Sequence, residues 1–354
     1  MEGSVDVTED PLVHSIKAQI SEADDLDANS RFKKPIIHRM RTHVRDEDPG
    51  ACRPKVVSIG PFHHGDASLR KMETLKRKFT YNLFMRSRCN CIDGMIDSIR
   101  RHEEEARAWY SEELELDSNE FVEMMIFDGC FLIELFLTYF REGWVFLWRE
   151  LFRLCDTTLD VVRDDCLMIE NQIPFFLLEE LFFFSRIRTP HLWELATEFL
   201  EVRNMLPERP ELVYHLLHLL HSSLDPRLYD NPAQSHISTG RSAGSETSPG
   251  LSTLDTLPWA MHGGETRTRS PSLEIPSLTL EESTKARLQN LIILELVHPQ
   301  VGDYFTCYAT LMGSIIKTTA DVEILRRCGI LYGKMQNDEA AHMFKSLHRI
   351  AKCD

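Results

Sequence analysis

Residues 121–140 constrain the fold more than any other stretch, because a helix formed by them would be apolar almost all the way round. Such a helix has to be covered by other elements on most of its surface. Asp117 and Ser118 precede it and can accept hydrogen bonds from the free N–H groups of a first helical turn. Glu120 and Glu123 then suit the positive end of the helix dipole. We predict a central, buried helix that begins near Asp117.

Most of the remaining chain repeats apolar residues at spacings of three and four, as amphipathic helices do. Pro174 divides the apolar stretch 161–184, and since its ring fixes φ and removes a donor, it should open a helix or kink one. Residues 56–59 form a short β-branched run ended by glycine and proline, which predicts a short strand or an extended segment. The further predicted helices cover about 68–84, 92–110, 145–155, 161–184, 191–203, 210–222, 280–297, 301–317, 320–328 and 338–351.

Serine, threonine, glycine and proline dominate residues 223–272, a composition that buries too little apolar surface to offset the entropy of ordering. We predict a mainly α, multi-helix globular domain with at most a few short strands and a long disordered linker. Its parts are a disordered acidic N-terminus at 1–30, with at most a short helix around 12–20, an N-terminal helical part at 31–222, the linker at 223–272, and a C-terminal helical part of the same domain at 273–354.

The formal net charge of -15 disfavours nonspecific binding to nucleic acid and to anionic lipid. A local basic patch is still compatible with the sequence at Arg70, Lys71, Lys76, Arg77 and Lys78. Nine scattered cysteines, several of them inside apolar runs, indicate a reducing compartment without a disulfide framework. The pair Cys89 and Cys91 lacks the CxxC spacing of a structural zinc site. We find neither a signal sequence nor the roughly 18 uninterrupted apolar residues of a membrane span, and expect an intracellular protein.

Four blocks of unusual sequence follow one another along the chain. They are VVSIGPFHHG at 56–65 with Met72, Glu73 and Lys76 after it, MMIFDGCFLIELF at 124–136, DDCLMIENQIPFFLLE at 164–179, and a fourth made of Ile275, Pro276, Asn290, Leu291, Ile292, Glu295, Asp321, Val322, Leu325, Gly329 and Ile330. In the order and approximate spacing of these blocks, the chain resembles the plant family known as domain of unknown function 247, whose members are also called UPF0481 proteins. The resemblance covers roughly residues 35–351.

The resemblance implies a protein without an established catalytic activity and without a cofactor. Some grass members of the family are associated with pollen-side self-incompatibility, and members usually end in a membrane-spanning helix. This sequence stops at Asp354 before such a helix, and residues 223–272 stand where the family usually has a further helix and strand region. We therefore expect a truncated or divergent member without an anchor of its own, located in the cytoplasm or peripherally at a membrane. Its expected partners are unidentified proteins and not nucleic acid.

The polar and small residues of the blocks are the candidate site residues, and we interpret them as structural. They are Gly60, Pro61, His63, His64, Gly65, Glu73, Lys76, Asp128, Gly129, Glu134, Glu170, Asn171, Gln172, Pro174, Asn290 and Glu295. His63 and His64 with Glu73 would in principle supply a metal site or a general base. Adjacent histidines on an extended segment point to opposite sides, however, which favours a ring nitrogen that ties the loop to a nearby helix.

The carboxylates of the second and third blocks allow the same two interpretations. Asp128 and Glu134 lie six residues apart and therefore not on one helix face, and burial would raise their pKa values. Pairing with arginine or capping of a neighbouring backbone is the alternative. Residues 170–172 directly precede Pro174. We predict that their side chains cap the helix that Pro174 opens and form hydrogen bonds between helices.

We find no G-x-S-x-G elbow, Walker A motif or GxGxxG loop. This favours a noncatalytic plant interaction or signalling protein. The alternatives are an unrecognised hydrolase or metal-dependent enzyme that uses the region of His63, His64 and Glu73, a membrane-linked recognition determinant, and a decayed paralogue. The noncatalytic hypothesis predicts buried and paired signature residues. Convergence of those three side chains with Glu134 and Glu170 in one open cavity would count against it.

Overall fold

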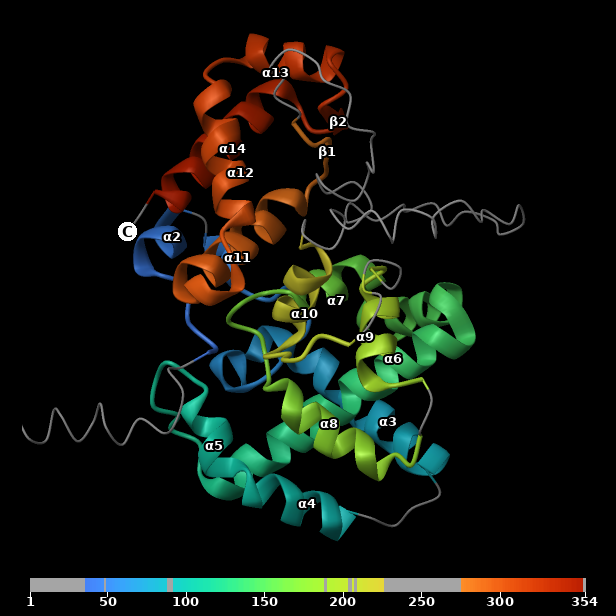
Figure 1. Cartoon of the computed structure of the whole chain (residues 1–354). Helices are drawn as coiled ribbons and strands as arrows, with labels where there is room; N and C mark the ends of the chain where they lie inside the picture. Colours follow the sequence, from blue (N-terminus) through green and yellow to red (C-terminus); the bar gives the residue numbers. More distant parts are fainter. Residues whose placement is uncertain are drawn as a thin grey trace, which may run out of the picture.

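The computed structural model describes residues 36–47, 49–87, 92–187, 190–202, 206, 209–225 and 275–352, and these ranges are built almost entirely of helices (Figure 1). The mainly α prediction is thereby confirmed. The α-helices are α2 (Thr42–Glu47), α3 (Arg70–Ser87), α4 (Ile92–Arg101), α5 (Glu103–Ala108), α6 (Ser118–Cys155), α7 (Leu159–Cys166), α8 (Phe175–Phe184), α9 (Leu192–Phe199), α10 (Leu216–Ser223), α11 (Thr284–Val297), α12 (Tyr304–Ile315), α13 (Thr319–Arg327) and α14 (Asn337–Ala351). The predicted helix at 12–20, residues 226–272 of the predicted linker, and the pair Cys89 and Cys91 lie outside the described residues.

Helix α6 is the central helix that the sequence predicts. The side chain of Asp117 accepts the N–H groups of Asn119 and Glu120, at 2.8 and 2.9 Å, and the Glu120 carboxylate accepts the N–H of Asp117 at 3.0 Å. This reciprocal capping box satisfies donors that an open helix end would leave without partners. The apolar first part of α6 packs against α3, α4, α8 and α9, and its side chains Phe131 and Phe136 are fully buried.

The backbone of α6 breaks its helical geometry at Gly143, where φ is 77° and ψ is 175°. Such a φ suits glycine, which has no Cβ to clash with the neighbouring carbonyl. Residues 130–138, before this break, are buried, and after it several aromatic side chains, among them Trp144 and Phe146, are exposed. The break separates the two apolar stretches, 121–140 and 145–155, that the sequence shows as distinct.

Several predicted helices differ from the observed ones at an end or in the middle. The predicted stretch 161–184 is interrupted between the end of α7 at Cys166 and the start of α8 at Phe175. The stretch 92–110 is divided between α4 and α5 at His102, whose φ of -102° and ψ of 4° are not helical. In the stretch 210–222 the helix begins only at Leu216, because His215 is extended and its ring accepts the N–H of His218 as an N-cap. Leu280, predicted to start a helix, is instead the last residue of a strand.

That strand, β1 (Leu278–Leu280), pairs in parallel with β2 (Leu331–Gly333), with Leu278 opposite Leu331. The pair belongs to the group of helices α11 to α14, which lies at one end of the molecule, while α3, α4, α6 and α8 lie at the other (Figure 1). One apolar core runs through both groups and includes Phe136 and Phe344. Among the described helices, none combines the length and the hydropathy needed to cross a bilayer.

Candidate functional site

The run at 56–59 forms no strand and pairs with none among the described residues. Side chains supply the hydrogen-bond partners that a neighbouring strand would otherwise provide. The buried carboxylate of Asp165 on α7 accepts the N–H groups of residues 55, 56 and 57 at 2.8, 2.7 and 2.9 Å. Asn171 accepts the N–H of Ile59 at 2.7 Å and donates to the carbonyl of Val57 at 2.9 Å. Because buried backbone groups need partners, these side chains hold the segment in place.

Gly60 continues this segment in a conformation that only glycine adopts readily, with φ 76° and ψ -173°. Its N–H donates to the carboxylate of Asp128 on α6 at 2.8 Å. A Cβ added at Gly60 would lie 2.4 Å from the carbonyl oxygen of Gln172, to which the Tyr110 hydroxyl also donates at 3.2 Å. The first and third sequence blocks therefore touch backbone to backbone at Gly60.

Lys76 on α3 is completely buried and neutralises two carboxylates. Its Nζ lies 2.6 Å from Asp128 and 2.6 Å from Glu73. Burial alone would lower the pKa of Lys76, but the two carboxylates outweigh it and raise the pKa, so the ammonium stays charged. Lys76 therefore belongs to the interior and not to the local basic patch with which the sequence at 70–78 is compatible.

Glu170 lies at the base of an open cavity of about 510 Å³, which is lined by Arg39, Arg45, His63 and His64 among other residues. Its carboxylate accepts the N–H of residue 40 at 2.6 Å and an Arg45 N–H at 2.7 Å, and lies 3.3 Å from Nε2 of His63. Burial would raise the pKa of Glu170, but these hydrogen bonds outweigh it and lower the pKa, so Glu170 is ionised. His63 ties its loop to the third block, while His64 is exposed.

The other two carboxylates of the proposed catalytic set lie elsewhere. Glu73 contacts Lys76, and neither of them lines the cavity. Glu134 is buried on α6 and accepts from Arg86 at 2.8 Å. Among the residues that the structure describes, no three His, Cys, Asp or Glu side chains are placed to hold a metal ion. Of the five residues whose convergence would oppose a noncatalytic function, His63, His64 and Glu170 thus line one open cavity, whereas Glu73 and Glu134 lie elsewhere.

The prediction that residues 170–172 cap the helix after Pro174 is wrong. No side chain caps α8, because Pro174 itself stands at the N-cap and the N–H of Phe175 donates to the carbonyl of Tyr214 at 2.7 Å. Gln172 instead donates to the carbonyl of Met168 at 2.7 Å and accepts the N–H of residue 217 at 3.3 Å. These side chains link α7, α10 and the segment 55–60, which agrees with the predicted bonding between helices.

The polar residues of the fourth block also bind backbone groups. Asn290 on α11 accepts the N–H of Ile169 at 2.8 Å, which joins the C-terminal helices to the third block. Glu295 accepts the N–H groups of residues 305 and 306, at 3.0 and 2.7 Å, in the first turn of α12. Its carboxylate also lies 2.9 Å from Nε2 of His221 on α10.

The remaining signature positions have steric roles. A Cβ on Gly129 would lie 2.3 Å from Cδ1 of Leu181, so the missing side chain lets α6 and α8 approach closely. Pro61 occupies the first position of the short 3-10 helix η2 (Pro61–His63), where its fixed φ is compatible with the helix. Gly65 has φ 80°, and no neighbouring atom lies within 4 Å of the place where its Cβ would be.

A group of buried histidines was not predicted from the sequence. His215, His218 and His221 follow one another at intervals of three around α10, and this spacing was the visible signal. The ring of His298 packs beside Tyr214, and its Nε2 lies 2.8 Å from the carbonyl of residue 36. Burial lowers the pKa of His218 to about 3 and also lowers the pKa values of His215 and His298. These three rings are therefore neutral in the fold.

The histidines should make stability depend on pH in one direction. A histidine whose pKa is depressed in the fold takes up a proton on unfolding. Its contribution to the free energy of unfolding is therefore fully present above pH ~6.5 and is lost as the pH falls. We expect the slope of unfolding free energy between pH 6 and 5 to decrease by about 1.4 kcal/mol per pH unit in His218→Gln. Urea titrations at several pH values measure it. The exposed His342→Gln is the control, and equal slopes in wild type and His218→Gln would contradict the expectation.

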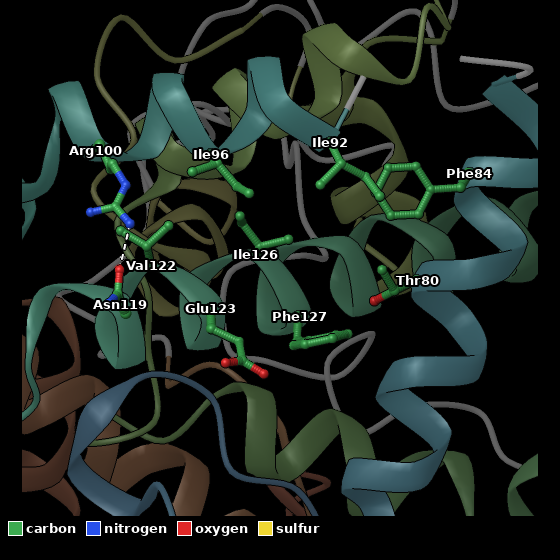
Figure 2. Close-up of a pocket in the computed structure, with 10 residues that line it drawn as sticks. All are labelled: Thr80, Phe84, Ile92, Ile96, Arg100, Asn119, Val122, Glu123, Ile126 and Phe127. Atoms are coloured by element: carbon green, nitrogen blue, oxygen red, sulfur yellow. Dashed lines mark hydrogen bonds between the residues drawn. The ribbon is translucent and has the colours of Figure 1, made fainter. Parts of the chain in front are cut away.

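An apolar groove of about 350 Å³ lies between α3, α4 and α6 (Figure 2). Figure 2 shows Ile92 and Ile96 pointing from α4 toward α6, Ile126 pointing back, and Phe84 reaching in from α3. At one end Arg100 donates to Asn119 at 2.5 Å. The lining also includes Thr80, which is only 5% exposed and whose hydroxyl has no hydrogen-bond partner among the described residues.

Together these features define a mainly helical protein in which polar side chains of α6, of α7 and of the turn after α7 fix the segment 55–60. A family model described as DUF247, plant protein of unknown function, matches residues 37–354. The chain belongs to this family, as its sequence blocks predicted. It is 24% identical to UPF0481 protein At3g47200 of Arabidopsis thaliana over 335 residues, 85% of this chain and 70% of the relative. It is 20% identical to the putative UPF0481 protein At3g02645 of the same plant over 410 residues, 85% of this chain and 75% of that relative. No solved structure matches the chain.

Proposed function

We propose that this chain is a noncatalytic interaction protein that binds an acidic protein partner through an exposed surface of α3 and α6. This α3–α6 surface consists of Tyr81, Met85, Trp144, Val145, Phe146 and Phe152. Of the twelve exposed large apolar side chains in the described residues, seven lie on these two helices, since Phe140 is also exposed. Exposed large apolar side chains gathered on neighbouring helices are typical of interaction sites in folded proteins.

The two helices run side by side in opposite directions along this surface. Lys78 of α3 forms an ion pair with Glu150 of α6, and Met72 contacts Cys155 at 3.9 Å. Farther along α3, Arg86 reaches Glu134 of the earlier part of α6. The exposed residues of α3 at positions 81 and 85 therefore lie beside the part of α6 around Gly143, and the apolar side chains of both helices belong to one region.

The charge around the α3–α6 surface indicates which kind of partner it would bind. Residues 77–87 and 140–155 together carry six basic and two acidic residues, a net charge of +4, whereas the whole chain carries -15. A surface that combines aromatic side chains with arginine is typical of the centre of a protein interface. An acidic partner with an apolar patch complements it.

The signature residues support a noncatalytic function because their polar groups already bind the fold itself. Asp165 binds three backbone N–H groups, Asp128 binds Lys76, and Glu295 binds the start of α12. His63 and His64 do line an open cavity, but Glu73, the third member of the alternative hydrolase or metal site, is engaged by Lys76. We therefore do not propose catalysis.

To test the proposal, the tagged full chain is used to capture binding proteins from plant cells. The captured partner is then purified for measurement of its affinity. In the double variant Phe146→Ser/Phe152→Ser we expect the dissociation constant to rise about 30-fold, as for loss of about 2 kcal/mol at an interface hot spot. The matched control is Phe183→Ser on α8, where the side chain is 77% exposed but lies on another helix. Thermal melting should show both variants folded.

Three outcomes would reject the proposal. The partner could bind the double variant as tightly as the wild type. Light scattering could show that the surface joins two copies of this chain. Sedimentation with vesicles could show that the double substitution removes binding to anionic lipid while leaving protein binding unchanged, which would make a membrane the ligand.

A further inference from the structure

The groove between α3, α4 and α6 holds one buried polar atom among its apolar side chains. Thr80 on α3 is only 5% exposed, and its hydroxyl has no hydrogen-bond partner among the described residues. Figure 2 shows Thr80 pointing from α3 toward α6, at the same end of the groove as Phe84. An unpaired hydroxyl in such surroundings is costly, and a ligand oxygen that pairs with it would remove the cost. The groove is therefore suited to a ligand with a hydrogen-bonding group at this end.

We propose that the groove binds a neutral, mainly apolar small molecule that carries one hydroxyl or carbonyl group. The oxygen of the ligand pairs with the Thr80 hydroxyl, which can donate and accept, and the hydrocarbon part packs against Ile92, Ile96 and Ile126. Ile92 is 47% exposed and the other two are half-buried, so the ligand would remove apolar surface from water. An apolar lining with a few polar groups that fix orientation is the usual character of small-molecule sites.

The dimensions of the groove set the size of the ligand. Its volume is about 350 Å³, within the range of small-molecule pockets. If each non-hydrogen atom takes the ~30 Å³ of a water molecule in the liquid, the groove holds about twelve such atoms. Figure 2 shows Arg100 at the end opposite Thr80. Ile92 and Arg100 are eight residues apart on α4, which corresponds to a length of about 12 Å. A chain of about eight to ten carbon atoms with one oxygen fits these limits.

The charges around the groove favour a ligand without a charge of its own. Lys76, one turn before Thr80 on α3, already lies 2.6 Å from each of two carboxylates. A charged group beside Thr80 would therefore be buried without a counter-charge, which is costly. Among the described lining residues the charged ones are Arg100, which donates to Asn119, and Glu123, and their charges are opposite. The lining thus has no net charge that would attract an ion.

The inference goes beyond the proposed function and does not depend on it. Tyr81 and Met85 of the α3–α6 surface belong to the same helix as Thr80 but do not line the groove. Loss of partner binding at the α3–α6 surface would leave the groove and its unpaired hydroxyl unchanged.

Calorimetric titration of the full chain with 1-octanol tests the proposal. We expect one saturable site with a dissociation constant of about 0.1–1 mM, as for other ligands of this size. Octanoate has the same chain length with a charged end, and it should bind at least about tenfold more weakly. Absence of binding by 1-octanol would overturn the proposal, and so would octanoate binding that is equally tight or tighter.

The substitution Thr80→Val tests the hydroxyl directly. Valine keeps the shape without the oxygen, and we expect the dissociation constant of 1-octanol to rise about fivefold, as for loss of one hydrogen bond. Thr80→Ser keeps the oxygen and should bind within about twofold of the wild type. The melting temperature of unliganded Thr80→Val should not fall, because the substitution removes an unpaired buried hydroxyl. Equal affinity of the wild type and Thr80→Val for 1-octanol would contradict the proposal.

A second pair of variants tests whether 1-octanol binds in this groove. Ile92→Ser should raise the dissociation constant about threefold or more, because apolar contact is lost. The matched control is Ile324→Ser on α13, where the side chain is 54% exposed and distant in the fold from the groove (Figure 1). Equal affinities of both variants would place the ligand elsewhere and reject the proposal. A protein that binds the wild type but not Ile92→Ser, without any binding of 1-octanol, would make the groove a protein interface instead.

Discussion

Replacement of Lys76 by methionine is expected to lower the free energy of unfolding by about 3–5 kcal/mol, the usual cost of removing one partner of a buried ion pair. The Lys76 ammonium is 0% exposed and lies 2.6 Å from both Asp128 and Glu73. Without it, the buried Asp128 carboxylate keeps only the N–H of Gly60 as a partner among the interactions described above. Methionine has a similar length, so the loss reflects the uncompensated charge more than a cavity.

Urea unfolding followed by circular dichroism measures this effect. Lys71→Met on the same helix is the control, because Lys71 is exposed, and it should change the free energy of unfolding by no more than about 0.5 kcal/mol. Adding Asp128→Asn to Lys76→Met removes the stranded charge and should recover part of the stability. If Lys76→Met unfolded at the same urea concentration as the wild type, the ion pair would have no structural importance.

Replacement of Gly60 by alanine should be comparably damaging, with an expected loss of about 3 kcal/mol or more. Two costs combine at this position. The backbone at φ 76° and ψ -173° is strained for any residue with a Cβ, and the new Cβ would meet the carbonyl oxygen of Gln172 at 2.4 Å. Since that oxygen belongs to the backbone, it cannot move without shifting the third sequence block.

Gly65 provides a matched comparison five residues later. It has a similar φ of 80°, but no atom lies within 4 Å of its missing Cβ. Gly65→Ala should therefore cost only the conformational strain, about 1–2 kcal/mol. Thermal or urea unfolding of both variants separates strain from collision. Equal destabilisation by the two substitutions would show that the approach of Gln172 has no energetic importance.

Local patterns predicted the helices well because they depend on neighbours in sequence. The capping box of Asp117 and Glu120 was visible as an N-terminal signal, and the apolar stretch after it became the buried centre of α6. The ends of the helices were predicted less accurately than their positions. At His215 a ring nitrogen caps α10 in place of the oxygen that usually marks an N-cap, so the pattern of apolar residues alone placed the start too early.

The candidate site was predicted only as a set of residues and not as a set of partners. The sequence indicated that a histidine ring would tie its loop to a nearby helix, but the partner of His63, Glu170, lies in the turn between α7 and α8. The sequence allowed Lys76 either in a local basic patch or as a structural signature residue, and only the contact with Asp128, fifty-two positions later, shows that Lys76 lies in the interior. The histidines of α10 were not singled out in the sequence, because their burial is a property of the packed structure.

The sequence by itself determined the family, the helical class and the central helix, because block order, apolar periodicity and capping are all properties of short stretches. Only the tertiary structure decided which polar groups meet. Asp165 and Lys55 are 110 positions apart, Glu170 and Met40 are 130 apart, and Ile169 and Asn290 are 121 apart. A hydrogen bond needs its atoms within about 3 Å, and no local spacing encodes which distant segments will approach so closely. That approach results from packing of the whole apolar core around α6.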